Sequence, residues 1–159
     1  MLTQLKLPLR LLVRTPMLTL AGARGAMGIS EDDIRDMISD GELPWAWDIS
    51  TKGAGRTELR ILAACVDHAQ KDLLSGSGTG VSPVIEEADV IRLLYGEERP
   101  WIWGKEFHRA WNFDRRHLFN LIFDGSLQLL PRTRWRRGPG GSPCVTWNSA
   151  VDFLRKRKL

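Results

Sequence analysis

Residues 30–43, SEDDIRDMISDGEL, and residues 114–127, DRRHLFNLIFDGSL, decide the fold because they are two copies of one pattern. Each copy begins with a side chain that can cap a helix, continues with apolar residues at helical spacing, and ends in Asp-Gly-x-Leu. The copies are 84 residues apart without a gap. This period is too long for a solenoid, so the sequence predicts two small domains of one kind.

The residues around the first copy predict a helix-turn-helix followed by a β-hairpin. The expected elements are a helix over 19–27, a helix over 30–41 capped by Ser30, strands over 43–49 and 57–61 with a tip at 52–55, and a helix over 62–74.

The second copy repeats this order. The expected elements are a helix over 104–111, a helix capped by Asp114 and ended by Gly125, strands over 127–135 and 144–147 with a tip at 136–141, and a last helix beginning at Asn148 or Ser149. Between the copies, the stretch SGSGTG (75–80) has the composition of a flexible linker. Pro83 after Ser82 predicts the start of a spacer helix that ends at Gly96.

These patterns predict a mainly helical α+β protein with two tandem winged helix-turn-helix units, each with a β-hairpin wing. The expected parts are an N-terminal arm (1–17), a first unit (18–74), a linker and spacer helix (75–98), and a second unit (99–159). The arm alternates apolar and basic or proline residues, so we expect it to pair with a sheet edge or pack on a neighbour. An organellar transit peptide is the alternative for this segment.

The net charge of +4 conceals an asymmetry between the two ends of the chain. Residues 1–80 hold 9 Lys/Arg and 10 Asp/Glu, whereas residues 99–159 hold 13 Lys/Arg and 4 Asp/Glu. A basic block of this size favours binding to nucleic acid or to another anionic surface. A solvated basic face without a partner is the alternative.

Four side chains of the 114–125 helix are candidates for contact with DNA. Leu118, Leu121 and Ile122 must face inward, which leaves Arg115, Arg116, His117 and Asn120 on the outer and N-terminal surface. In a helix-turn-helix, the N-terminal part of this helix enters the major groove. Arginine pairs well with guanine and asparagine with adenine.

The hairpin of the second copy adds four arginines near a glycine-rich tip, which are Arg132, Arg134, Arg136 and Arg137. Their guanidinium groups repel one another unless anions such as phosphates approach. The sequence therefore predicts that this wing contacts DNA, with RNA or an acidic protein as alternative partners.

The first copy has Glu31, Asp32 and Asp33 where the second has Arg115, Arg116 and His117. Placing those carboxylates on phosphates would juxtapose like charges at a cost of several kcal/mol. The hairpin of this copy offers Lys52, Arg56 and Arg60, which leaves a weak contact with the DNA backbone as the alternative. We expect the first unit instead to dimerise or to bind a protein partner.

The sequence offers little for catalysis, metal binding or membrane insertion. Glu86, Glu87 and Asp89 cluster without a nearby His or Cys, and SGSGTG lacks the lysine and flanking elements of a phosphate loop. Cys65 and Cys144 are expected to be buried thiols, which suits a reducing cytoplasm. We therefore expect no enzyme activity, no cofactor, no metal and no membrane span.

The stretch from Trp103 to Leu154 resembles the excisionase and MerR-type winged helix-turn-helix family. The resemblance rests on the helix 104–111, the turn at Asn112 and Phe113, the capped helix 114–124, the run Asp-Gly-Ser-Leu at 124–127, and the closing NSAVDFLRKR. Residues 19–70 resemble the family more faintly, through GISEDDIRDMISDGEL and RTELRIL. The resemblance implies DNA binding through the second helix and the wing. The coiled-coil helix and effector domain of MerR regulators have no counterpart, which speaks against a metal or drug sensor.

The sequence therefore predicts a protein that binds double-stranded DNA, as a transcription regulator or a mobile-element factor, in the bacterial cytoplasm at the nucleoid. The alternatives are an adaptor whose helix-turn-helix units dock or dimerise with proteins, and an RNA-binding factor.

Overall fold

The computed structural model describes residues 15–76, 84–131 and 143–159, which form an α+β fold with small antiparallel sheets. The elements in chain order are β1 (Met17–Thr19), α1 (Leu20–Met27), α2 (Glu31–Ser39), β2 (Ala46–Asp48), β3 (Leu59–Leu62), α3 (Ala63–Ser75), α4 (Glu87–Tyr95), β4 (Trp101–Trp103), α5 (Gly104–Ala110), α6 (Arg115–Phe123), β5 (Cys144–Thr146) and α7 (Trp147–Arg157).

The sequence repeat is also a repeat of structure. β1, α1 and α2 recur as β4, α5 and α6 with starting residues shifted by 84. The antiparallel pairing of β1 with β3 joins Met17 to Leu62, and the pairing of β4 with β5 joins Trp101 to Thr146, again with a shift of 84. We call residues 17–75 the first repeat and residues 101–157 the second repeat.

The register of strand pairing after the second helix is shifted by one residue between the two repeats. Ala46 of β2 pairs with Ile61, whereas Leu129, not Leu130, pairs with Val145 in the second repeat. Because side chains alternate between the faces of a strand, a one-residue slip places different residues on the inner face. Leu127 still matches Leu43, but the orientation of residues 128–130 therefore does not follow from the first repeat.

The predicted caps of the second helices are confirmed. Ser30 Oγ accepts from Asp33 N at 3.1 Å, and the Asp33 carboxylate accepts from Ser30 N, which makes a reciprocal capping box. Asp114 Oδ1 accepts from His117 N at 2.8 Å. The start predicted for the last helix is too late, since α7 begins at Trp147 and Thr146 Oγ1 accepts from Ser149 N.

The helix between the repeats differs from the predicted spacer in both its start and its role. Residues 84–86 are not helical, and α4 begins at Glu87, where Glu87 and Asp89 suit the positive end of the helix dipole. Val90, Leu94 and Tyr95 are buried. This helix therefore belongs to the core.

One continuous hydrophobic core spans both repeats, with Trp111 at its centre. The ring of Trp111 meets Trp47 of the first repeat edge-on at 5.4 Å and Phe153 at 5.3 Å. Its Nε1 donates to the Tyr95 hydroxyl at 3.0 Å, and that hydroxyl donates to the Ala150 carbonyl at 2.9 Å. The repeats are therefore held together by the same packing that holds each repeat.

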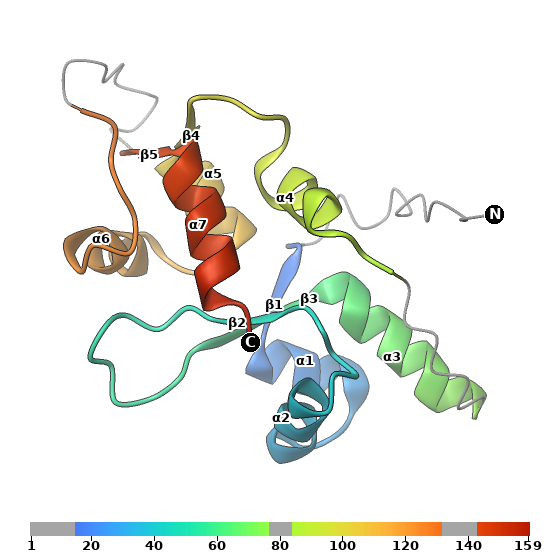
Figure 1. Ribbon diagram of the computed structural model, residues 1–159. Coiled ribbons are helices and arrows are strands. Elements are labelled where there is room, and N and C mark those ends of the chain that lie inside the picture. Colours follow the sequence, from blue (N-terminus) through green and yellow to red (C-terminus); the bar gives the residue numbers. More distant parts are fainter. Residues whose placement is uncertain (1–14, 77–83, 132–142) are drawn as a thin grey trace.

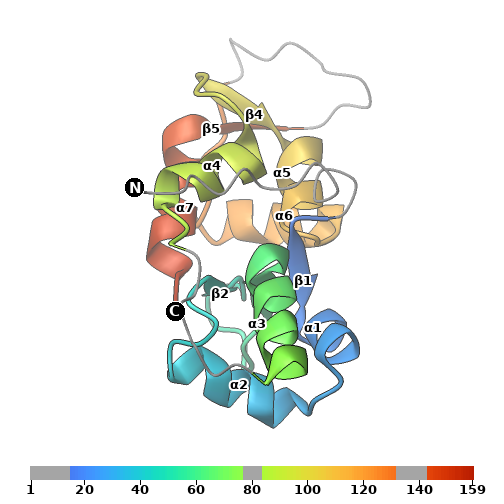
Figure 2. The ribbon, with the colours of Figure 1, turned by 90° about the vertical axis from the view of Figure 1, so that its right-hand side faces the viewer.

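The repeats lie one above the other, with the second repeat uppermost (Figures 1 and 2). α7 runs from the small sheet of the second repeat towards β2, so the C-terminus lies against the first repeat (Figure 1). There Leu159 N donates to the Ala46 carbonyl at 3.0 Å, and the Lys158 ammonium lies 3.9 Å from the centre of the Trp45 ring. The C-terminal residues of the chain thus help to join the repeats.

The segment predicted to be an arm lies largely outside the described residues. Its end, Met17, is buried and begins β1, which is an edge strand of the sheet ordered β1-β3-β2. In the described parts of the chain, no helix has both the length and the apolar character needed to cross a membrane.

A close backbone approach makes Gly104 intolerant of a side chain. A Cβ at this position would lie 2.7 Å from the Pro143 carbonyl oxygen and 2.9 Å from Leu118 Cδ2. Gly104→Ala is therefore expected to lower the free energy of unfolding by about 1–3 kcal/mol in chemical denaturation. Gly25→Ala is the matched control, because a Cβ at Gly25 in α1 would have no neighbour within 4 Å. That control should raise stability by up to about 1 kcal/mol, and equal effects of the two substitutions would contradict the close approach.

Candidate nucleic-acid interface

A sharp turn between α5 and α6 sets the direction of α6. Asn112 adopts φ 57°, a left-handed conformation that asparagine tolerates better than most residues, and Gly28 has φ 69° at the equivalent position of the first repeat. Leu118 and Leu121 are buried and hold α6 against the core. The opposite side of α6 therefore faces solvent.

Three of the four α6 residues predicted to contact DNA are exposed, which are Arg115, Arg116 and Asn120. The Arg115 guanidinium lies 5.3 Å from the centre of the Phe119 ring, one turn along the helix. No carboxylate in the described residues pairs with Arg115 or Arg116. Both positive charges are therefore available to an external anion.

His117 faces the first repeat, a role that differs from the predicted contact with DNA. Its side chain is 15% exposed, and its Nε2 lies 2.7 Å from the Ile49 carbonyl oxygen. Because a carbonyl oxygen only accepts, Nε2 must carry the proton and donate it. Nδ1 lies 3.6 Å from the Glu58 carboxylate. His117 therefore joins α6 to the first repeat.

The loop between β2 and β3, residues 49–58, lies along α6, and we call it the first hairpin loop (Figure 1). Lys52 N donates to Asp124 Oδ2 at 2.8 Å, and the Arg157 guanidinium donates to the Ser50 carbonyl. Partial burial acts to raise the pKa of Asp124, but hydrogen bonds from Ser126 and from Lys52 N outweigh it and hold that pKa below its ordinary value. Asp124 is therefore a stable anchor for the loop at neutral pH.

A polar cavity of about 450 Å³ lies between α6 and the first repeat. It brings together Arg116, His117 and Asn120, which the sequence predicted, and two residues of the first repeat that it did not. The lining residues are Glu58, Arg60, Asn112, Phe113, Asp114, Arg116, His117 and Asn120. The cavity contains charges of both signs, since Glu58 and Asp114 line it beside Arg116, and Arg116 and Asn120 are also exposed to solvent.

Arg60 joins the two repeats and is not a surface cation of the hairpin. It is 5% exposed, and its Nε donates to the Trp111 carbonyl at 2.9 Å. One terminal nitrogen donates to the Asn112 carbonyl at 2.9 Å and pairs with Glu58 at 3.1 Å. Its guanidinium group therefore fixes the end of α5 and the turn before α6. No motif in the sequence distinguished Arg60 from the exposed Lys52 and Arg56.

The four arginines of the predicted wing, Arg132, Arg134, Arg136 and Arg137, lie outside the described residues. The residues on either side of them are described, and of the strand predicted over 127–135 they show a single bridge, which joins Leu129 to Val145 of β5. Leu130 N donates to the Cys144 carbonyl at 3.0 Å, and Thr146 N donates to the Gln128 carbonyl at 3.0 Å. The residues flanking this basic segment are thus paired as in a hairpin.

The equivalent helix of the first repeat, α2, presents acids to solvent. Glu31, Asp32 and Asp33 are all exposed in its first turn, where the helix dipole favours negative charge. Asp33 is engaged in the capping box with Ser30. The two second helices therefore carry opposite charge at their N-terminal ends, as the sequence indicates.

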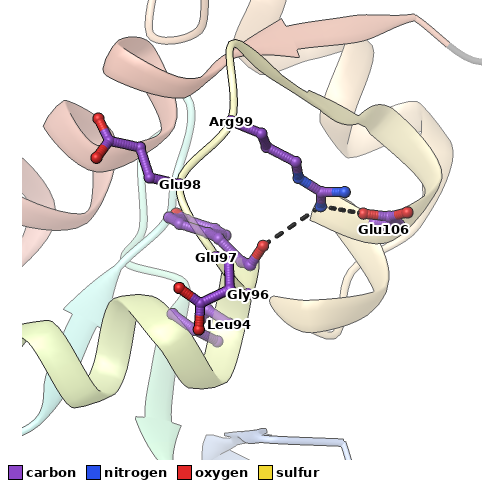
Figure 3. Close-up of a pocket in the computed structure, with 7 residues that line it drawn as sticks. Leu94, Gly96, Glu97, Glu98, Arg99 and Glu106 are labelled. Carbon is purple, nitrogen blue, oxygen red and sulfur yellow. Dashed lines mark hydrogen bonds and ion pairs between the residues drawn. The ribbon is translucent and has the colours of Figure 1, made fainter.

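A larger cavity of about 560 Å³ lies at the end of α4 and has an acidic rim (Figure 3). Arg99 crosses it and donates to the Tyr95 carbonyl at 3.3 Å and to the Glu106 carboxylate. Glu97 and Glu98 add two further carboxylates to its lining. Nowhere in the described residues do three His, Cys, Asp or Glu side chains gather where they could hold a metal ion. Its acidic rim makes this cavity a poor site for a polyanion.

Both cysteines are buried free thiols, as predicted. Burial raises the pKa of the Cys65 thiol to about 11, despite a hydrogen bond with the Trp45 backbone and the nearby charge of Lys158. Because the thiolate is the nucleophile, Cys65 is protonated and unreactive at neutral pH.

Comparison of this chain with family models, with curated proteins and with solved structures gave no match.

Proposed function

We propose that this chain is a DNA-binding protein made of two tandem winged helix-turn-helix units, and that it binds duplex DNA through α6 and the basic segment that follows it. One observation carries the proposal. α6 presents Arg115 and Arg116 in its first turn and Asn120 further along to solvent, and neither guanidinium has a carboxylate partner in the described residues.

The arrangement of α5 and α6 supports reading α6 as a recognition helix. α5, a turn of four residues and α6 follow each other in the order of a helix-turn-helix, with the second helix capped and packed through Leu118 and Leu121. In such a motif the N-terminal residues of the second helix reach base edges. Arg116 and Asn120 are the types of residue that read guanine and adenine there.

The distribution of charge along the chain supports DNA binding mainly by the second unit. The basic residues 99–159 suit phosphates, whereas exposed Glu31, Asp32 and Asp33 on α2 would repel them. In this proposal α2 does not enter a groove, and the acidic side of the first repeat is left for a protein partner or a second copy of the chain.

In the cell, we propose that the protein acts at the bacterial nucleoid as a transcription regulator or a mobile-element factor. It is a binding protein rather than an enzyme. An RNA-binding factor and a protein-docking adaptor are the competing functions, and the experiment below separates them from duplex DNA binding.

The wild-type chain is expected to retard a pool of random-sequence duplex DNA at low salt, with affinity that falls as salt rises. The double substitution Arg115→Gln and Arg116→Gln should weaken binding about 10- to 100-fold and reduce the salt slope by about 1 to 2, since each phosphate contact contributes about 0.9 to that slope. Electrophoretic retardation at several salt concentrations measures both quantities. Selection of bound sequences from the pool should show relaxed base preference for Asn120→Ala.

Lys71→Gln is the matched control, because Lys71 is an exposed cation on α3 of the first repeat. It should leave affinity and salt slope close to wild type. Absence of any duplex retardation at low salt would sink the proposal. Preferred binding of single-stranded or structured RNA over duplex DNA would favour the RNA-binding alternative instead.

A further inference from the structure

We infer that the first hairpin loop, residues 49–58, contacts DNA phosphates through Lys52 and Arg56 beside α6, so that the first repeat supplies a second wing to the recognition helix of the second repeat. This inference rests on the proposed DNA-binding function and extends it. The acidic α2 alone would suggest that the first repeat stays away from DNA.

The first hairpin loop is fixed along α6 by contacts at both ends of the helix. His117, in the first turn of α6, donates to the Ile49 carbonyl at 2.7 Å. Asp124, the residue that follows the helix, accepts from Lys52 N at 2.8 Å. A helix of nine residues is about 14 Å long, so the loop is held in place over that length. A segment held in this way has little freedom to lose when it binds.

The position of Lys52 places a positive charge at the C-terminal end of α6. A Cβ placed on Gly125 would lie 3.8 Å from Lys52 Nζ, so the ammonium group lies beside the end of the helix. Arg115 and Arg116 lie at the other end, about 14 Å away along the axis. The major groove of B-DNA is about 12 Å wide, so cations at the two ends of α6 can reach the strands on either side of it.

The loop itself is suited to a phosphate backbone. Residues 51–57, TKGAGRT, contain two cations and no acid, and all except Thr51 are exposed. No carboxylate in the described residues pairs with Lys52 or Arg56, while the nearby Glu58 is already paired with Arg60 at 3.1 Å. Gly53 and Gly55 have no side chain, which lets the backbone of the tip come close to a phosphate.

The acidic helix does not stand in the way of this contact. The loop extends beneath α6, whereas α2 lies lower and to the right of it (Figure 1). Arg35 of α2 donates to Thr57 Oγ1 at 3.4 Å, so α2 meets the loop near its return to β3 rather than at Lys52. DNA that approaches α6 therefore meets the basic tip of the loop before the carboxylates of α2.

Salt-dependent retardation of random-sequence duplex DNA by the full chain tests the inference. Lys52→Gln with Arg56→Gln should weaken binding about 5- to 10-fold at low salt and reduce the salt slope by about 1 to 2. The selected base preference should stay that of the wild type, because phosphate contacts carry no sequence information. Thermal unfolding should be unchanged, since both side chains are exposed and the anchoring bond to Asp124 uses the Lys52 backbone.

Photocrosslinking supplies a second readout. Ala54→Cys puts a thiol on the exposed tip of the loop, whereas Cys65 and Cys144 are both buried, so a photoreactive label can be attached at residue 54 alone. Crosslinks should map to nucleotides next to those whose protection depends on Arg116. If wild type binds and Lys52→Gln with Arg56→Gln behaves like Lys71→Gln, the inference is overturned while the proposed function stands. If wild type binds no duplex, both fail.

Discussion

Replacement of Trp47 by alanine is expected to lower the free energy of unfolding by about 3–5 kcal/mol. Trp47 has no exposed surface, although it lies in a strand of only three residues. Its ring meets Trp111 of the second repeat edge-on at 5.4 Å, and its Nε1 donates to the Leu154 carbonyl at 2.9 Å. Alanine would leave a cavity between the repeats and a buried carbonyl without its donor. Chemical denaturation followed by circular dichroism measures the loss.

The shared core predicts how this loss should appear. Because Trp47 joins the repeats, the wild-type chain should unfold in one transition, and Trp47→Ala should either shift that transition or split it in two. Phe123→Ala is the matched control, since Phe123 is an aromatic residue that is 83% exposed, and it should change stability by less than about 0.5 kcal/mol. Equal losses for the two variants would contradict the packing between the repeats.

A partial substitution separates packing from hydrogen bonding at the same position. Trp47→Phe keeps an aromatic ring and removes the donor to the Leu154 carbonyl, so it should cost less than alanine, about 1–3 kcal/mol. A loss as large as that of alanine would show that the hydrogen bond rather than the ring contact dominates.

The elements of each repeat could be predicted from the sequence because local signals specify them. Ser30 and Asp114 cap their helices through their own side chains, and Gly41 and Gly125 adopt φ 79° and 81° just after those helices. Each of these features needs only neighbouring residues. The sequence therefore indicated α1, α2, α5 and α6 to within one or two residues at most boundaries.

The contacts between the repeats could not be predicted, because they depend on residues far apart in the chain. The sequence groups Arg60 with the hairpin cations Lys52 and Arg56, and its burial follows only from the position of the Asn112 carbonyl 52 residues away. His117 was expected to face DNA, and the Ile49 carbonyl that it contacts belongs to the other repeat. Arg60 and His117 are polar, and their neighbours in the sequence would be equally compatible with an exposed side chain.

The role of α4 was mispredicted for a related reason. Its apolar residues fit a helix face, but a single amphipathic pattern does not reveal which surface it covers. Tyr95 is the only tyrosine in the chain, and its hydroxyl links Trp111 to the Ala150 carbonyl in the core. The position of α4 therefore depends on a hydrogen-bond chain that no local motif encodes.

Replacement of Arg60 by methionine is expected to lower the free energy of unfolding by about 2–4 kcal/mol, because it removes a buried guanidinium group that donates to two backbone carbonyls and pairs with the partly exposed Glu58. Methionine has a similar length but no donor. The carbonyls of Trp111 and Asn112 would lose the guanidinium bonds of 2.9 Å each, and Glu58 would lose its cation. Denaturation measures the loss, and Arg24→Met, on an exposed arginine of α1, should cost less than about 0.5 kcal/mol.

Arg60 also connects stability to the proposed function, because the turn that it holds sets the direction of α6. Arg60→Lys keeps the charge but cannot donate to two carbonyls and to Glu58 in the same fork geometry, so it should recover only part of the stability. At temperatures where Arg60→Lys is still folded, its affinity for duplex DNA should fall although Arg60 is 5% exposed. The salt slope should stay at the wild-type value, since no phosphate contact is removed. A reduced slope would instead mean that Arg60 itself touches DNA, which its burial against the Asn112 carbonyl argues against.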